Sequence, residues 1–212
     1  MFGFDGITFA VFAALGALSL VATSVTFYKI IQLARLGLGR RRKMAPVFEA
    51  CAHGQTDQAI RALGNAKGVL PRVLGATLAG LRHKPGDTVY AEEIGRQAAL
   101  GELSRLSRQM RLLESVVQAA PMLGLLGTVI GMIDAFAKLS EASGAVDPAL
   151  LAGGIYTALT TTAAGLTIAI IFYFVANWLE ARIENERLDM EMAISAAIHG
   201  PAAQGAAGPG TA

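Results

Sequence analysis

Compact and hydroxylated residues recur along two uncharged stretches of the chain, where they offer close backbone approach or hydrogen bonds. Steps of three and four residues place side chains on one face of an α-helix. The first stretch follows this rhythm with Pro121, Gly124, Thr128, Gly131 and Ala135. The second stretch follows it with Ala158, Thr162, Gly165 and Ala169. Each stretch is therefore expected to form a helix with one stripe that lacks bulky side chains.

Two interpretations of these stripes stay open. Small residues let helix backbones approach closely, which favours helix association in lipid. Gly127 and Gly131 form such a small-residue pair, although this signal is weak by itself. Alternatively, the stripes line a cavity that receives a helix from another chain. Both interpretations can hold, because adjacent faces of one helix can serve different contacts.

Threonines add hydrogen-bonding groups beside the stripes. Besides Thr128, the two stretches carry Thr157, Thr160, Thr161, Thr162 and Thr167. A buried hydroxyl can donate to the carbonyl three or four residues earlier in its own helix, and we expect most of these to do so. A hydroxyl that faces a cavity can instead hydrogen-bond to a carboxyl group or to a chain of water molecules.

Titratable side chains are missing from the middle of these stretches, so the chain alone provides no proton relay there. Asp134 follows Thr128 by six residues, which is about 9 Å along a helix. We therefore expect Asp134 to be a solvated or capped acid at the outer boundary of the membrane.

Metal-binding and catalytic patterns are also missing from the sequence. The single cysteine, Cys51, excludes an internal disulfide and a cysteine-based metal cluster, and is expected to be a small apolar residue in a helix. His53, His83 and His199 share no metal-ligand spacing, and HExxH, GxSxG and glycine-rich phosphate motifs do not occur. We therefore predict no metal, no cofactor, no catalytic residue and no enzyme activity.

The stripes lie in two of three long uncharged runs. Hydrophobic residues make up 53% of the chain and charged residues 16%, whereas soluble domains carry about 25% charged residues. The uncharged runs lie between Asp5 and Lys29, between Glu114 and Asp134, and from Pro148 to Leu179. Because about 20 apolar residues of helix cross a bilayer core, the sequence predicts three transmembrane helices. The segment before the first predicted helix contains one acid, Asp5, and no basic residue, which favours a retained anchor over a cleaved signal peptide.

The basic residues predict the orientation of these spans. Most Lys and Arg lie between Lys29 and Arg111, including the run GRRRK at 39–43, whereas Lys138 is the single basic residue between the second and third spans. The positive-inside rule then places the N-terminus outside, and the middle segment and C-terminus in the cytoplasm. The basic run is interpreted as a topology signal with lipid contact as a further role. The net charge of +2 gives no reason to expect nucleic-acid binding.

Between the first two spans the chain is expected to be helical. A helix begins at the capping-type Thr56 and Asp57 and ends at Gly64, and a second covers 69–83 before the KPGD turn. From Val89 the pattern then predicts one uninterrupted helix that runs into the second span. The third span is expected to continue as a helix to Gly200, before a disordered tail rich in Pro and Gly.

The predicted fold is therefore an all-α integral membrane protein with three transmembrane helices, of which helices two and three extend into a cytoplasmic helical domain. The predicted order begins with a periplasmic N-terminus and first span (1–32), a cytoplasmic helical domain (33–112) and a second span (113–139). It continues with a periplasmic loop (140–149), a third span (150–178), a cytoplasmic C-terminal helix (179–199) and a disordered tail (200–212).

The segments APMLGLLGTVIGMIDAF at 120–136 and GGIYTALTTTAAGLTIAI at 153–170 resemble the MotA/TolQ/ExbB proton channel family. Three spans with one large insertion after the first are similar to the TolQ/ExbB branch, that is, to ExbB-like biopolymer transport proteins. MotA-type members have four spans and are longer. The resemblance covers about 120–170 in its motifs and agrees with the whole predicted topology.

The resemblance implies a ring-forming subunit, a homopentamer, of an inner-membrane motor that uses the proton motive force. Its partner would be an ExbD/TolR-like single-span protein whose transmembrane Asp binds the proton, and a TonB- or TolA-like protein would receive the work. The implied pore-lining residues are Thr128, Thr162, Gly124, Gly131, Ala135, Ala158, Gly165, Ala169 and Thr157, with Thr128 and Thr162 facing the partner's Asp.

The chain departs from the family pattern in two places. Many relatives have Glu where this chain has Thr157, and several have a Pro late in the third span where this chain reads TIAIIFYF. The alternative function is a membrane scaffold that packs helices through small residues and carries no ions. A membrane-embedded enzyme finds no support in the residues.

Overall fold

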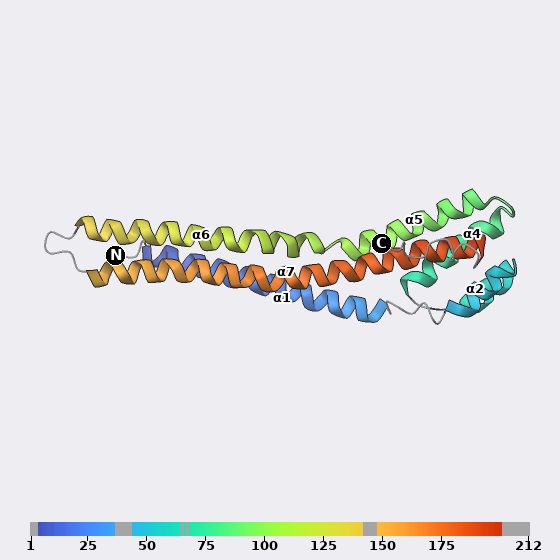
Figure 1. Ribbon diagram of the computed structural model, residues 1–212, viewed down its shortest axis with the longest axis horizontal. Helices are drawn as coiled ribbons and strands as arrows, with labels where there is room; N and C mark the ends of the chain where they lie inside the picture. The colour runs from blue at the N-terminus through green and yellow to red at the C-terminus, as the bar shows by residue number, and fades with distance from the viewer. Residues whose placement is uncertain (1–3, 37–43, 65, 67, 142–147, 201–212) are drawn as a thin grey trace, which may run out of the picture. The chain divides into compact units, whose positions relative to one another are not determined.

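The computed structural model describes residues 4–36, 44–64, 66, 68–141 and 148–200 (Figure 1). These described residues form seven α-helices and no strand. The helices are α1 (Phe4–Leu36), α2 (Ala45–Ala52), α3 (Thr56–Leu63), α4 (Val69–His83), α5 (Thr88–Ser107), α6 (Met110–Glu141) and α7 (Pro148–His199). The predicted all-α fold is confirmed.

The chain divides into two compact units. The first, called the membrane unit, comprises Met1–Tyr28 and Gln109–Trp178, and the second, called the helical unit, comprises Lys29–Arg108 and Leu179–Ala212. The long helices α1 and α7 therefore each contribute residues to both units. Within Thr8–Ala34, Thr88–Ser140 and Leu151–His199 lie three helices that are long and apolar enough to cross a membrane, as predicted.

In the membrane unit, α1 packs against α6 and α7. Val11 and Leu15 of α1 are buried together with Ala120 of α6 and Ala169 of α7. Partly buried apolar residues pack around this cluster, namely Leu123, Ala164 and Ile168. The small side chains of Ala120 and Ala169 leave room for the larger Val11 and Leu15 of α1.

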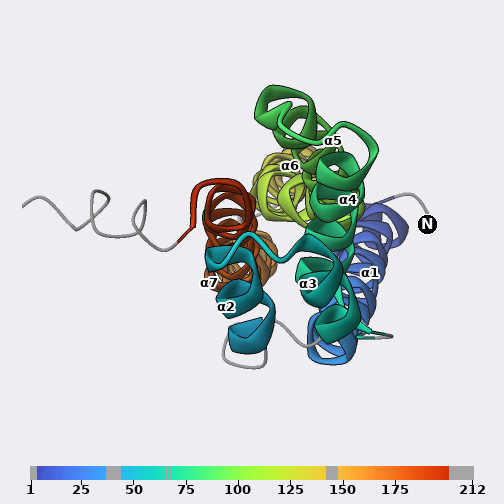
Figure 2. The same cartoon turned by 90° about the vertical axis from the view of Figure 1, so that its right-hand side faces the viewer.

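In the helical unit, α4 and α5 form a hairpin (Figure 2). The turn between them is the predicted KPGD signal: Gly86 has a φ of +88°, and the Asp87 carboxylate accepts the Tyr90 amide at 2.9 Å. The two helices approach closely, because a Cβ added to Gly80 would lie 2.9 Å from the Cα of Ala91. The predicted helix over 69–83 is confirmed by the bounds of α4.

Two details of the predicted helices are wrong. The predicted start of the helix at Thr56 is confirmed, since α3 covers Thr56–Leu63, but its N-cap is Gln55 without a side-chain cap hydrogen bond, so the capping role expected of Thr56 and Asp57 is wrong. The predicted continuous helix from Val89 into the second span is interrupted, because α5 ends at Ser107 and α6 begins at Met110. Neither Pro nor Gly occupies this interruption, so local sequence gave no sign of it.

The remaining helix predictions have mixed outcomes. The end of α3 at Gly64, with a φ of +51°, is confirmed. The third span does continue as one helix, α7, to His199. The basic run at 39–43 is not among the described residues, and the predicted tail lies outside them except for Gly200.

A pair of glycine substitutions in α5 tests the packing of the helical unit. A Cβ on Gly95 would overlap with Thr77 Oγ1 and lie 3.2 Å from Ile194 Cγ1, whereas a Cβ on Gly101 would meet nothing within 4 Å. We expect Gly95→Ala to lower the free energy of unfolding by about 1–3 kcal/mol. The control Gly101→Ala should raise it by about 0.5–1 kcal/mol, because Gly is a poor helix former. Thermal unfolding in detergent checks both, and equal midpoints for the two variants would contradict this packing.

Candidate functional site

The two stripes of small residues face each other across the contact between α6 and α7. A Cβ added to Gly124 would lie 2.9 Å from the carbonyl oxygen of Thr161, and one added to Gly131 would lie 2.9 Å from Ala158 Cβ. A Cβ on Gly165 would overlap with the carbonyl oxygen of Ala120. The helix backbones are therefore so close that these three positions admit no side chain without a shift.

Alanines complete the same contact. The stripe alanines are buried, namely Ala135, Ala158 and Ala169. The structure therefore shows the close helix packing that was one of the two interpretations. The glycine and alanine faces are already filled by the neighbouring helix of the same chain, so a direct role for them in lining a pore stays a prediction.

Three threonine hydroxyls gather beside these glycines, and they form the candidate site. Thr128 Oγ1 donates to the Leu125 carbonyl at 2.6 Å and lies 3.2 Å from Thr162 Oγ1. Thr162 Oγ1 donates to the Gly124 carbonyl at 2.9 Å. Thr161 Oγ1 lies 2.7 Å from the Ala158 carbonyl and 3.2 Å from the Gly124 carbonyl.

The three hydroxyls differ in their access to a further group. Thr161 is fully buried, so its hydroxyl serves the helix contact alone. Thr128 and Thr162 are half-buried, at an edge of the α6–α7 contact. Each hydroxyl has one proton and two lone pairs, so the pair keeps acceptor capacity for a third group. The site is thus neutral, compact and able to exchange hydrogen bonds.

The other threonines of α7 do not join this pair. Thr157, Thr160 and Thr167 are exposed, and their hydroxyls donate to carbonyls of their own helix at 2.8–3.0 Å. Thr157 is separated from Thr162 by five residues, or about 140° around the helix. The structure therefore brings Thr128 and Thr162 together and leaves Thr157 apart from them.

Two residues of this contact were missed by sequence reasoning as site residues. Thr161 is the fully buried threonine of the cluster, and a Cβ on Gly127 would overlap with its Oγ1. The small-residue pair Gly127 and Gly131 was the signal that pointed to such a contact, but it does not say which threonine fills the space.

Charged and metal-ligating groups lie away from the pair. Asp134 forms an ion pair with Lys138 at 2.8 Å, and its side chain is 18% exposed, so the expected acid is capped by a neighbour one turn later. Cys51 lies in α2, where burial raises the pKa of its thiol. Among the described residues, no three His, Cys, Asp or Glu side chains gather as metal ligands would.

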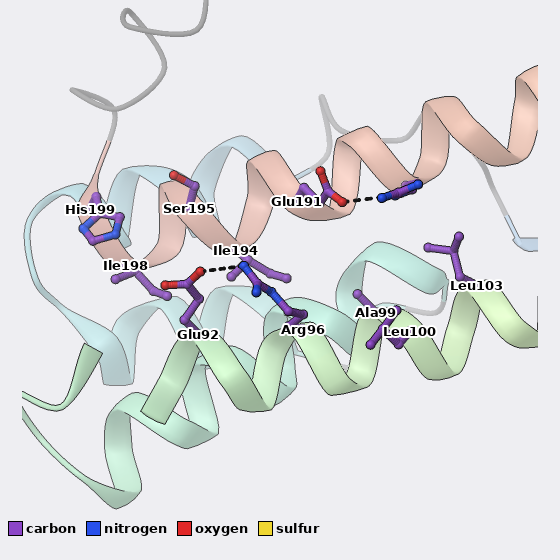
Figure 3. A pocket seen from close by; sticks show the side chains of 11 residues that line it. Glu92, Arg96, Ala99, Leu100, Leu103, Glu191, Ile194, Ser195, Ile198 and His199 are labelled. Atoms are coloured by element: carbon purple, nitrogen blue, oxygen red, sulfur yellow. Dashed lines mark hydrogen bonds and ion pairs between the residues drawn. The ribbon is translucent and has the colours of Figure 1, made fainter. Parts of the chain in front are cut away.

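A separate groove lies in the helical unit, between α5 and the end of α7 (Figure 3). Its volume is about 590 Å³, and its walls include Leu100, Leu103, Ile194 and Ile198. The charged groups at its rim pair along their own helices, since Arg96 bonds Glu92 at 3.0 Å and Arg187 bonds Glu191 at 3.1 Å. These four charges are thus already compensated by neighbours on their own helices.

A matched pair of glycine substitutions in α7 tests the α6–α7 contact. Gly165→Ala places a Cβ against the backbone of Ala120, which cannot move aside as a flexible side chain can. We expect a loss of about 1–3 kcal/mol in stability. Gly153→Ala meets nothing within 4 Å and should be neutral or slightly stabilising. Thermal unfolding in detergent distinguishes them, and a tolerated Gly165→Ala would refute the close approach.

Known proteins share this sequence pattern. Residues 65–192, more than half of the chain, match the model of the MotA/TolQ/ExbB proton channel family. A putative biopolymer transport protein ExbB homolog of Methanothermobacter thermautotrophicus is 28% identical over 187 residues, 88% of this chain and 64% of that protein. The biopolymer transport protein ExbB of Aquifex aeolicus is 35% identical over 95 residues, 45% of this chain and 60% of that protein.

A third relative matches a shorter segment of the chain at a higher identity than these two. The biopolymer transport protein exbB1 of Vibrio cholerae is 46% identical over 61 residues, 29% of this chain and 27% of that protein. The chain thus spans less than two thirds of the length of each of these relatives. The family match and the three apolar helices together identify a multi-pass membrane protein. The chain belongs to the MotA/TolQ/ExbB proton channel family, in its ExbB-like branch.

Proposed function

We propose that this chain is a ring-forming subunit of an inner-membrane motor that uses the proton motive force. In this proposal a TolR/ExbD-like single-span protein is its partner, and the work energises TonB- or Tol-dependent transport or envelope processes. Family membership and the relatives named as biopolymer transport proteins support the proposal. The family is one of channels, so we propose no enzyme activity and no cofactor.

The observation that carries the proposal is the hydroxyl pair of Thr128 and Thr162, 3.2 Å apart and half-buried. The spans around the pair hold no Asp, Glu, Lys, Arg or His between Glu114 and Asp134 or from Pro148 to Leu179. A neutral wall of this kind cannot carry a proton alone. It can accept a carboxyl group from a partner helix and exchange hydrogen bonds with it.

The energies are compatible with such a step. One proton that crosses 100 mV releases about 2.3 kcal/mol. A hydrogen bond between neutral groups contributes about 1 kcal/mol net. One proton can therefore replace a small number of hydroxyl contacts, which allows a partner helix to move along or around the wall.

The other predicted site residues receive a supporting role in this proposal. Gly124, Gly131 and Gly165, with the three stripe alanines, hold α6 and α7 so close that the two hydroxyls meet. The pore surface proper is then the edge that carries Thr128 and Thr162. Thr157 adds a hydroxyl and no charge, so the proposed proton step does not pass through it.

The proposed arrangement in the membrane follows from the basic residues. The N-terminus is placed in the periplasm, and the segment between the first and second spans and the C-terminus in the cytoplasm, because basic residues concentrate there. We further propose a homopentamer, with membrane lipid around it and no nucleic-acid partner.

A second candidate function is a membrane scaffold, favoured by the close packing of the two stripes within one chain. A scaffold needs the glycines and alanines of the contact. It does not need the hydroxyl of a half-buried threonine at the edge. The two candidates therefore differ in what they require of Thr162.

Thr162→Val separates the two functions. We expect proton flux through the partner-bound complex in proteoliposomes to fall by up to about tenfold, because the variant loses an acceptor for the protonated carboxyl group, and a hydrogen bond between neutral groups contributes about 0.5–1.5 kcal/mol. The matched control is Thr160→Val on the same helix, whose exposed hydroxyl donates to the Tyr156 carbonyl. This control should keep its flux.

Assembly of both variants is measured in parallel by the mass of the purified complex. A Thr162→Val complex that assembles and conducts like the unmodified protein would favour the scaffold. A Thr162→Val chain that assembles but loses flux, beside a conducting Thr160→Val chain, supports the motor.

A further inference from the structure

The interruption between α5 and α6 needs a cause outside its own sequence. Residues 103–112 read LSRLSRQMRL, with neither Gly nor Pro, yet α5 ends at Ser107 and α6 begins at Met110. A helix that ends leaves its last four carbonyl groups without intrahelical donors. Leu106 belongs to this last turn of α5, so its carbonyl oxygen needs another partner.

Lys29 of α1 provides that partner inside the helical unit. Its ammonium donates to the Leu106 carbonyl oxygen at 2.5 Å and to Gln32 Oε1 at 3.0 Å. Among the residues that the structure describes, Lys29 is the largest fully buried side chain, with 0% exposure, and Leu106 is fully buried as well. A cation at the C-terminal end of a helix is favourably placed for the helix dipole and for hydrogen bonds to the last carbonyls.

A lysine at the end of a transmembrane helix normally extends its ammonium into the interfacial water. Lys29 does not, because it is completely buried. Burial of an ammonium is costly unless it is hydrogen-bonded, and both of its partners are neutral. The nearby turn of α5 carries a buried carboxylate, Glu102, but Arg72 and Arg105 bind it at 3.0 and 3.3 Å.

We propose that Lys29 is a positioning residue that caps α5 from α1. Its hydrogen bond to the Leu106 carbonyl holds the interruption at Arg108 and Gln109 and fixes the end of α5 to α1. Without it, α1 no longer holds the end of α5 in place, and the backbone can tighten until the Leu106 carbonyl also accepts the Met110 amide, as in a continuous helix. Neither Lys29 nor Leu106 belongs to the proposed ion path, and the inference does not depend on ion flow.

Solid-state NMR of the full chain in lipid bilayers tests the hydrogen bond directly. The protein is labelled with ¹⁵N at lysine Nζ and with ¹³C at the leucine carbonyl carbon. Dipolar transfer between the two labels should give one lysine–leucine signal in the unmodified chain. Lys29→Met should abolish the signal, whereas the matched control Lys84→Met, at a half-exposed lysine of the same unit, should keep it. An unmodified chain without the signal overturns the proposal.

Amide hydrogen exchange tests the effect on the interruption. We expect the Met110 amide to exchange about tenfold or more slowly in Lys29→Met, because it gains the Leu106 carbonyl as acceptor. Lys29→Arg, which keeps a cationic donor, should restore the original rate. Unchanged exchange in Lys29→Met would overturn the claim that Lys29 holds the interruption. If Lys29→Met does not fold, two other measurements decide. A change of the Met110 exchange rate in Lys29→Arg would count against the proposal. A missing lysine–leucine signal in the unmodified chain would also count against it.

Discussion

The close approach of α6 and α7 is the contact on which the rest of the membrane unit depends. Gly124, Gly131 and Gly165 leave room for backbone atoms of the facing helix, and a methyl group at any of them would collide with it. This approach brings the hydroxyls of Thr128 and Thr162 to 3.2 Å. The small residues thus set the distance between α6 and α7. This distance in turn fixes the positions of the two hydroxyls at the edge of the contact.

Much of this architecture could be predicted from sequence. The three spans follow from uncharged runs that a soluble core does not need, and α4 and α7 end where Gly, Pro or a turn signal ends them. The stripes were visible as residues at steps of three and four. What the stripes face could not be predicted, because a row of small residues suits a neighbouring helix and a cavity equally well. The structure shows the neighbouring helix, and the cavity remains a proposal for the edge at Thr162.

The larger error has its physical origin in a tertiary contact. The helix from Val89 has no local breaker before its interruption, and the partner of the Leu106 carbonyl, Lys29, lies 77 residues earlier in the chain. Sequence periodicity describes one helix at a time, so it cannot detect a cap supplied by a distant helix. The error at Thr56 is a separate and local one. The N-cap of α3 is Gln55, so Thr56 is already the first residue of the helix.

The central claim is that this chain forms a ring around the charged helices of a partner. The most direct measurement is the native mass of the detergent-purified complex, co-expressed with a single-span protein that carries a mid-span Asp. The account predicts a pentamer of this chain that retains the partner. A monomer or dimer that retains no such partner would contradict it and leave the α6–α7 contact as helix packing alone.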